Sequence, residues 1–276
     1  MKKWQVAGLS FLLILTLSAC DLNMDSLGDG DTASDQGNSP LTAGEVIAKA
    51  DKAFEQVNSY TVKSESQQVI TVKTGGEETT IKSEILNESD WIKEPFQIHI
   101  LTEARMEGMG PTKSEQYYVP DEGYYSKISD RNWVKLADPE LQAKMYQSIL
   151  ENPETLIAQM TKLEKDIIFT EDKEYYVLSI LLPESELKQM SEVASSNRDI
   201  NSEVPSLLPI EITSMNLRLE ISKDTFLLQK TTIEQEIKSG VEQNAVSRTK
   251  VEVSAYSNFN GIESIEVPQE VIEGAS

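Results

Sequence analysis

Long segments in which apolar and polar side chains alternate constrain the fold of this chain more than any other feature. A period of two is typical of β-strands that bury one face and expose the other. The first such segments cover residues 60–102 and are interrupted by a turn at Gly75 and Gly76. We expect their apolar positions on one face of a sheet: Tyr60, Val62, Ile70, Val72, Ile81, Ile85, Phe96, Ile98 and Ile100.

The C-terminal third of the chain shows the same alternation. Apolar residues 217, 219 and 221 alternate with Arg218 and Glu220, and the pattern resumes after a turn at Lys223 and Asp224. The positions expected on this side are Leu217, Leu219, Ile221, Leu227, Gln229, Thr231, Ile233, Ile237, Val251, Val253 and Ala255. Because long strands twist and coil, this side is expected to be concave.

Helix signals lie at the start of the ordered sequence and between the two strand regions. Thr42 with Glu45 three residues later forms a capping box, and an apolar stripe at helical spacing follows it. Asp138–Pro139 and Asn152–Pro153 each combine an N-cap residue with proline at the first helical position, and Glu186–Ser195 predicts another helix. The fold class expected is α+β: a coiled antiparallel half-barrel of about 9 to 11 strands, with helices on its concave face.

The N-terminus has the three parts of a signal peptide. Lys2 and Lys3 precede an almost purely apolar run from Val6 to Leu17, and Ser18 and Ala19 follow as small residues. The run is shorter than the roughly 20 residues that a helix needs to cross a bilayer. It therefore predicts a leader that is removed, not a permanent span.

The end of this leader, Leu17-Ser18-Ala19-Cys20, resembles the lipobox of bacterial lipoproteins. The resemblance implies cleavage between Ala19 and Cys20, a diacylglycerol thioether on the Cys20 thiol, and often an acylated amino group. Two acyl chains hold a protein on a membrane far longer than one chain does. A buried apolar thiol and an intermolecular disulfide are the alternatives for a lone cysteine, but neither explains its position.

The expected organisation has three parts. Residues 1–19 are the lipoprotein signal peptide, residues 20–41 are the lipidated cysteine with an acidic tether, and residues 42–276 are a single domain. The tether is rich in Asp, Gly and Ser and has no hydrophobic period, so we expect it to be flexible. Asp21, Asn23 and Asp25 match the start of an EF-hand loop, but Ser26 and Thr32 break that pattern. We therefore expect no metal site and no cofactor.

The negative charge of the chain limits the classes of molecule that it is expected to bind. The formal net charge is −21, and removal of residues 1–19 with Lys2 and Lys3 changes it to −23. Such a surface repels nucleic acid, whose binding depends on Lys and Arg, and it repels anionic lipid headgroups. We expect no nucleic-acid partner, contact with the outer, extracytoplasmic face of the cell membrane only through the lipid anchor, and an unknown protein partner.

The order of these elements resembles the LolA-like and LppX-like lipoproteins, and among them uncharacterised Gram-positive members. The resemblance covers about residues 42–272 and lies in a lipobox, a polar tether, a helix leading into "SYTVKSE", the hairpin "LRLEISKDTFLLQKTTIEQEI" and the ending "YSNFNGIESIEVPQEV". It implies a half-barrel closed by helices, with a cavity that carries an acyl chain or other apolar ligand. The lining residues expected are Val62, Ile70, Phe96, Ile98, Ile100, Leu217, Leu219, Ile221 and Ile233, with Met145 and Met160 on the cover.

One alternative to a ligand cavity remains open. The same side chains can pack against the helices as a closed core, because alternation reports burial but not what buries a residue. The protein would then be a cell-surface interaction or sensing module, with Tyr117, Tyr118, Tyr124 and Tyr125 as exposed interface residues. An enzyme is not expected: His99 is the only histidine, and the nucleophile-elbow, phosphate-loop and zinc-protease motifs are absent from the sequence.

Overall fold

The first helix and the first hairpin form at the positions that a capping box and a glycine turn in the sequence predict. The computed structural model describes residues 40–136, 152–196, 210–241 and 244–275. Helix α1 (Ala43–Phe54) begins at Thr42, whose side chain accepts a hydrogen bond from the Glu45 backbone N–H while the Glu45 carboxylate accepts one from the Thr42 N–H. The hairpin of β1 (Ser59–Thr74) and β2 (Glu77–Ile92) turns at Gly75 and Gly76, which both have positive φ. Glycine alone adopts this backbone conformation without steric cost.

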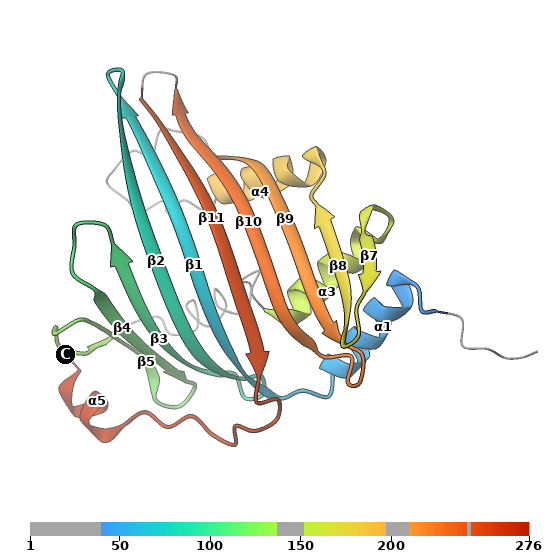
Figure 1. The fold of residues 1–276 in the computed structure, drawn as a ribbon. Helices are drawn as coiled ribbons and strands as arrows, with labels where there is room; N and C mark the ends of the chain where they lie inside the picture. The colour runs from blue at the N-terminus through green and yellow to red at the C-terminus, as the bar shows by residue number, and fades with distance from the viewer. Residues whose placement is uncertain (1–39, 137–151, 197–209, 242–243, 276) are drawn as a thin grey trace, which may run out of the picture. The chain divides into compact units, whose positions relative to one another are not determined.

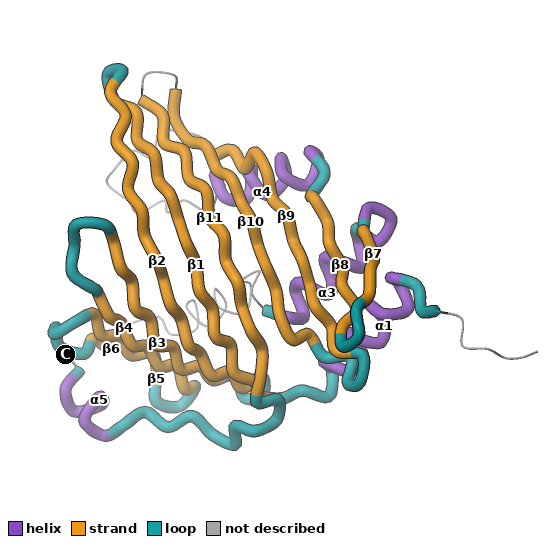
Figure 2. Tube along the Cα trace, viewed as in Figure 1, coloured by secondary structure: helices purple, strands orange, loops and turns teal. Residues whose placement is uncertain are grey.

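The other strands build one antiparallel sheet around this hairpin. Its order is β6-β5-β4-β3-β2-β1-β11-β10-β9-β8-β7, so the sheet is not closed and β6 and β7 are its edges (Figures 1 and 2). The remaining strands are β3 (Gln97–Met106), β4 (Thr112–Val119), β5 (Gly123–Ile128), β6 (Val134–Lys135), β7 (Ile168–Glu171), β8 (Tyr175–Leu181), β9 (Ile210–Ser222), β10 (Leu228–Val241) and β11 (Asn244–Ser257). The predicted α+β class and the long antiparallel sheet are confirmed.

Three helices lie on the same side of the sheet, which we call the helix face (Figures 1 and 2). They are α1, α3 (Pro153–Lys162) and α4 (Glu184–Ser196). The N-cap predicted at Asn152 is confirmed, since its side chain accepts a hydrogen bond from the Glu154 N–H. Among the described residues, the fourth helix is α5 (Gln269–Gly274), near the C-terminus. No helix within these residues has the length and apolar character needed to cross a membrane.

The main hydrophobic core lies between the helix face and these helices. The α1 residues Val46, Ile47, Ala50 and Phe54 pack into one cluster with the central strands, together with Leu156, Ile157 and Met160 of α3. Phe54 meets the ring of Tyr60 edge-on at 5.5 Å between centroids. Burial of the apolar stripes of α1 and α3 therefore fixes both helices on the sheet.

A second, smaller core lies on the opposite face, at the end of the sheet where β4 and β5 meet. Tyr117, Val119 and Tyr125 pack there against Ile265, Val267 and Val271 of the C-terminal segment. This segment is fastened at its start, because Asn58 donates its backbone N–H to Asn260 Oδ1 at 2.6 Å. We call the remainder of this face the open face.

The structure corrects the predicted side of β11. Val62 pairs with Tyr256 and Glu65 pairs with Val253, so Val251, Val253 and Ala255 share the open face with Lys63 and Glu65. The helix face of this strand carries Ser254 and Glu252, which are 0% and 2% exposed. The prediction was wrong here because alternation gives the period of a strand but not which of its two sides the rest of the chain covers.

Candidate functional site

Most of the predicted lining residues are part of the main core. Val62, Ile98, Met160, Leu217, Leu219, Ile221 and Ile233 are buried there, and Phe96 and Ile100 are partly buried against them. For the described residues, this arrangement matches the closed-core alternative. Ile70 lies on the same face of β1 but is only half-buried, and Met145 lies outside the described residues. A role for these side chains as ligand contacts stays a prediction.

One predicted lining residue borders a hollow. Phe96 lines a hollow of about 640 Å³ beside the end of α1, together with Tyr60, Trp91 and Lys93. Lys93 Nζ donates to the Phe54 carbonyl oxygen at 3.1 Å and to Glu154 Oε1 at 2.7 Å. Lys93 directly follows β2, so these contacts join the end of that strand to α1 and α3, and we assign Lys93 a structural role.

The four tyrosines predicted to be exposed are all buried. Tyr118 and Tyr124 belong to the core under the helix face, while Tyr117 and Tyr125 lie under the C-terminal segment. Consecutive residues of a strand point to opposite faces, and here both faces are covered. The tyrosine hairpin therefore offers no exposed aromatic patch.

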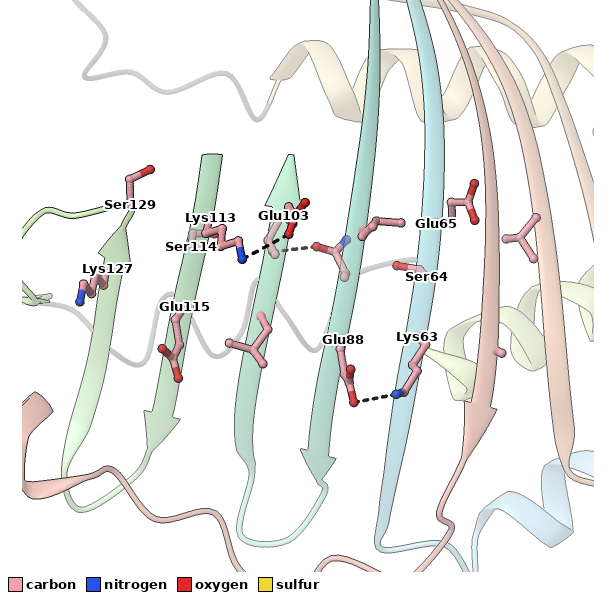
Figure 3. A pocket seen from close by; sticks show the side chains of 16 residues that line it. Lys63, Ser64, Glu65, Glu88, Glu103, Lys113, Ser114, Glu115, Lys127 and Ser129 are labelled. Atoms are coloured by element: carbon pink, nitrogen blue, oxygen red, sulfur yellow. Dashed lines mark hydrogen bonds and ion pairs between the residues drawn. The ribbon is translucent and has the colours of Figure 1, made fainter. Parts of the chain in front are cut away.

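A larger hollow lies on the open face, where the sequence analysis predicted no binding site. It is a groove of about 760 Å³ across β5, β4, β3, β2, β1 and β11 (Figure 3). At about 4.8 Å between neighbouring strands, six strands give a length of about 24 Å. Its apolar residues are Leu86, Leu101, Val253 and Ala255, and its charged residues are Lys63, Glu65, Glu88, Glu103, Lys113, Glu115 and Lys127.

Strand register arranges these residues in two neighbouring rows across the sheet. The first row runs Lys127, Glu115, Leu101, Glu88, Lys63 and Ala255. The second row runs Lys113, Glu103, Leu86, Glu65 and Val253. Side chains directly opposite in neighbouring strands are about 5 Å apart, so each row is a line of contacts. In both rows a leucine lies between glutamates.

Ion pairs hold the rim of the groove. Lys63 Nζ lies 2.9 Å from Glu88 Oε1, and Lys113 Nζ lies 3.5 Å from Glu103 Oε2 (Figure 3). Glu103 also accepts a hydrogen bond from Arg105 Nε at 2.9 Å. This bond is the main reason that the pKa of Glu103 lies below its ordinary value, and the charges of Arg105 and Lys113 act in the same direction.

The only histidine of the chain lies beside the groove. His99 stacks on the ring of Tyr117 at 4.2 Å between centroids, and its Nε2 lies 3.0 Å from Glu115 Oε1. The Tyr117 hydroxyl donates to the same oxygen at 2.6 Å. Burial raises the pKa of Tyr117 above its ordinary value, and Glu115 adds to the shift. These contacts fix the position of Glu115 at the groove.

Sequence reasoning missed the groove, although one signal pointed to it. Leu86 and Leu101 occupy positions that the alternating pattern assigns to the polar side of their strands. Apolar residues on the polar side of two paired strands indicate a contact surface on that side. The described residues contain no group of three or more His, Cys, Asp or Glu side chains that could hold a metal ion.

Comparisons with solved structures found distant similarity. A DUF1329 family protein from Desulfovibrio piger is 10% identical, with 83% of this chain and 95% of that chain covered and a TM-score of 0.22. A LolA superfamily protein from Nitrosomonas europaea is 14% identical, with 84% and 98% covered and a TM-score of 0.19. A β-barrel-like DUF1849 protein from Brucella abortus is 7% identical, with 73% and 98% covered and a TM-score of 0.21. Similarities with such scores carry no argument about function.

The sequence also matches a protein-family model. The model of DUF6612, described as a family of unknown function, matches residues 42–276. No curated protein matches the sequence.

Proposed function

This chain belongs to the DUF6612 family, whose function is unknown, and we propose that it is a ligand-holding protein of the cell envelope. In this proposal it is not an enzyme. A lipid on Cys20 anchors it to the outer face of the cell membrane, and the domain holds a lipid or another amphiphilic molecule. The membrane, through this anchor, and the ligand are its two proposed partners.

The groove on the open face is the single observation that carries the proposal. Its volume of about 760 Å³ lies within the range of about 300–1,000 Å³ that is usual for small-molecule sites. Leu86, Leu101 and Val253 offer an apolar floor, and burial of apolar surface stabilises a complex by about 25 cal/mol per Å². Charged residues at the rim can bind a polar group. A molecule with one apolar and one polar part fits this arrangement.

The open face supports ligand binding better than the helix face does. On the helix face, the predicted contacts such as Leu217 and Leu219 are fully buried against other side chains of the protein. A ligand there would have to displace packed side chains, which costs their mutual contacts. On the open face the leucines are already accessible, since Leu101 is 42% exposed.

The anchor explains how such a groove would meet its ligand. The lipobox resemblance at Cys20 and the acidic tether both come from the sequence, and residues 20–39 lie outside the described residues. A tether of about 20 residues lets a domain range over roughly 25 Å of distance from its anchor. The proposed protein would thus take up amphiphiles at or near the membrane surface.

Titration with dodecyl maltoside, a neutral amphiphile, tests the proposal. The protein would be produced without residues 1–19 and with Cys20→Ser, so that no lipid is attached, and titrated calorimetrically below the micelle concentration. We expect saturable binding that Leu101→Glu weakens by at least about tenfold, because it places a charge on the apolar floor. The matched control is Ile168→Glu, at another exposed apolar position on β7, and it should leave binding unchanged. Equal binding by both variants would overturn the assignment of the groove.

A protein-interaction module is the second candidate, and the closed packing of the described helix-face core favours it. The same titration separates the two functions. A protein that binds no amphiphile at all would support the module.

A further inference from the structure

Carboxylates surround the apolar floor of the groove. In the first row, Leu101 lies between Glu115 on β4 and Glu88 on β2. In the second row, Leu86 lies between Glu103 on β3 and Glu65 on β1. Any apolar group that rests on these leucines therefore meets a glutamate on both sides.

Two carboxylates of the groove, Glu103 and Glu115, are less exposed than two of its lysines, Lys63 and Lys113. The side chains of Glu103 and Glu115 are 26% and 33% exposed, whereas those of Lys63 and Lys113 are 61% and 72% exposed. Charges that water reaches are screened strongly, while partly buried charges act over a longer range. Glu103 and Glu115 therefore contribute more to the electrostatic potential at the floor than Lys63 and Lys113 do.

Each lysine of the groove already has a partner. Lys63 pairs with Glu88 and Lys113 pairs with Glu103, while Lys127 Nζ lies over the ring of Trp133 at 5.8 Å from its centroid. Glu65 differs from the other charged residues. Its Oε1 accepts a hydrogen bond from Gln67 Nε2 at 3.1 Å, and within the described part of the chain it forms no ion pair. Four carboxylates and three ammonium groups line the groove, and the Arg105 guanidinium also pairs with Glu103. Within the described part of the chain, Glu65 is therefore the carboxylate of the groove that has no ion-pair partner.

We propose that the ligand of the groove is a cationic amphiphile, with an amine, guanidinium or quaternary ammonium group next to a hydrocarbon part. This rests on the proposed function and specifies the chemistry of its ligand. The hydrocarbon lies over Leu86 and Leu101, and the cation lies next to Glu65, whose charge it neutralises. An anionic amphiphile would have to compete with carboxylates for the lysines of the rim.

Three probes with the same twelve-carbon chain test this inference: dodecyltrimethylammonium, dodecyl sulfate and dodecyl maltoside. Each is titrated below its micelle concentration into the protein that lacks residues 1–19 and carries Cys20→Ser. We expect the cation to bind about tenfold tighter than the sulfate, and the difference to shrink as salt is added. Sulfate binding that equals or exceeds cation binding would overturn the inference and leave the proposed function intact. Failure of all three probes would overturn the proposed function itself.

A conservative variant locates the cation. Glu65→Gln keeps the size and polarity of the side chain but removes its charge, so it should weaken binding of dodecyltrimethylammonium by about threefold. It should leave binding of dodecyl maltoside unchanged. Glu78→Gln, at an exposed position near the tip of the same hairpin, is the matched control. Equal effects of the two substitutions on the cation would show that only the net charge of the protein matters, and would overturn the site.

Discussion

Lys250 and Glu252 form an ion pair on the helix face of β11, with Lys250 Nζ at 2.5 Å from Glu252 Oε2. The Glu252 side chain is almost completely buried, and within the described part of the chain its second oxygen has no hydrogen-bond partner. Ser254 lies two residues further along the same face, and its buried Oγ also has no hydrogen-bond partner within the described part of the chain. A band of polar side chains therefore lies beside an otherwise apolar core.

Removal of the cation from this pair should destabilise the fold. Lys250→Met leaves the buried Glu252 carboxylate without its counter-charge, and we expect the free energy of unfolding to fall by about 3 kcal/mol. Urea denaturation measures the change. Lys63→Met is the control, because it breaks an ion pair of similar length that is exposed, and it should cost less than about 1 kcal/mol. Similar losses in the two variants would contradict the buried character of the Lys250–Glu252 pair.

Ser254→Ala should stabilise the protein. A buried hydroxyl without a partner costs roughly 1 kcal/mol of desolvation, and alanine removes that cost without leaving a large void. Thermal unfolding should show a higher Tm than for the unmodified chain. Ser66→Ala serves as a comparison, because Ser66 Oγ accepts a hydrogen bond from Gln68 Nε2 at 3.4 Å. This variant loses that bond and should be less stable than the unmodified protein. A lower Tm for Ser254→Ala would contradict the cost assigned to this hydroxyl.

Stability should decrease at alkaline pH because of Tyr60. Burial raises the pKa of its phenol far above the ordinary value, and Tyr256 and Glu154 add to the shift. Below a pH of about 10 the phenol is protonated in both the folded and the unfolded chain, so it makes no pH-dependent difference. Above that pH the unfolded chain loses the proton first, and the free energy of unfolding falls. Denaturation between pH 8 and 11 should show a smaller decrease for Tyr60→Phe; equal slopes would contradict the shift.

The C-terminal segment should loosen when Asn260 is changed. Its Oδ1 accepts from the Asn58 N–H at 2.6 Å, and its Nδ2 donates to the Gln56 carbonyl at 3.0 Å. We expect Asn260→Ala to cost about 2 kcal/mol, since it leaves both backbone groups without partners and its φ of 58° disfavours alanine. Hydrogen exchange should increase in residues 262–271. Asn260→Asp retains the Oδ1 acceptor and, like asparagine, tolerates a positive φ, so it should cost less than alanine. An equal loss would contradict a stabilising role for the hydrogen bond from the Asn58 N–H.

Replacement of Cys20 tests the anchor. If the thiol carries diacylglycerol, Cys20→Ser should move the protein from the membrane fraction to the soluble fraction and lower its mass by that of the lipid. Fractionation and mass spectrometry of the intact protein measure both effects. Ser18→Thr, a small change within the leader, is the control. An unchanged mass and distribution for Cys20→Ser would contradict the lipid attachment.

Local signals predicted much of this fold. The caps at Thr42 and Asn152 and the turn at Gly75–Gly76 are satisfied within a few residues, so the sequence alone was sufficient to place them. Strand periods were also predicted well, because they depend only on neighbours along the chain. The short edge strand β7 was missed, since four residues carry too little pattern to recognise.

Apart from the signal of Leu86 and Leu101, the site could not be predicted, because it depends on long-range pairing. The side of β11 follows from its register with β1, which joins Val62 to Tyr256. Likewise, burial of Tyr117 and Tyr125 depends on a C-terminal segment more than 100 residues away. Neither partner is visible from alternation, which describes each strand in isolation.

Odd- and even-numbered residues of a strand point to opposite faces of this sheet, and this limits how the sequences of the family can diverge. Even-numbered positions of β1, such as Val62, support the core, and odd-numbered ones, such as Glu65, line the groove. Substitutions at the odd-numbered positions can therefore change the ligand specificity of the groove without changing the residues of the core. Inserting a single residue near the middle of this strand would exchange the two roles beyond that point, so we expect length changes in homologues at hairpin tips and not within strands.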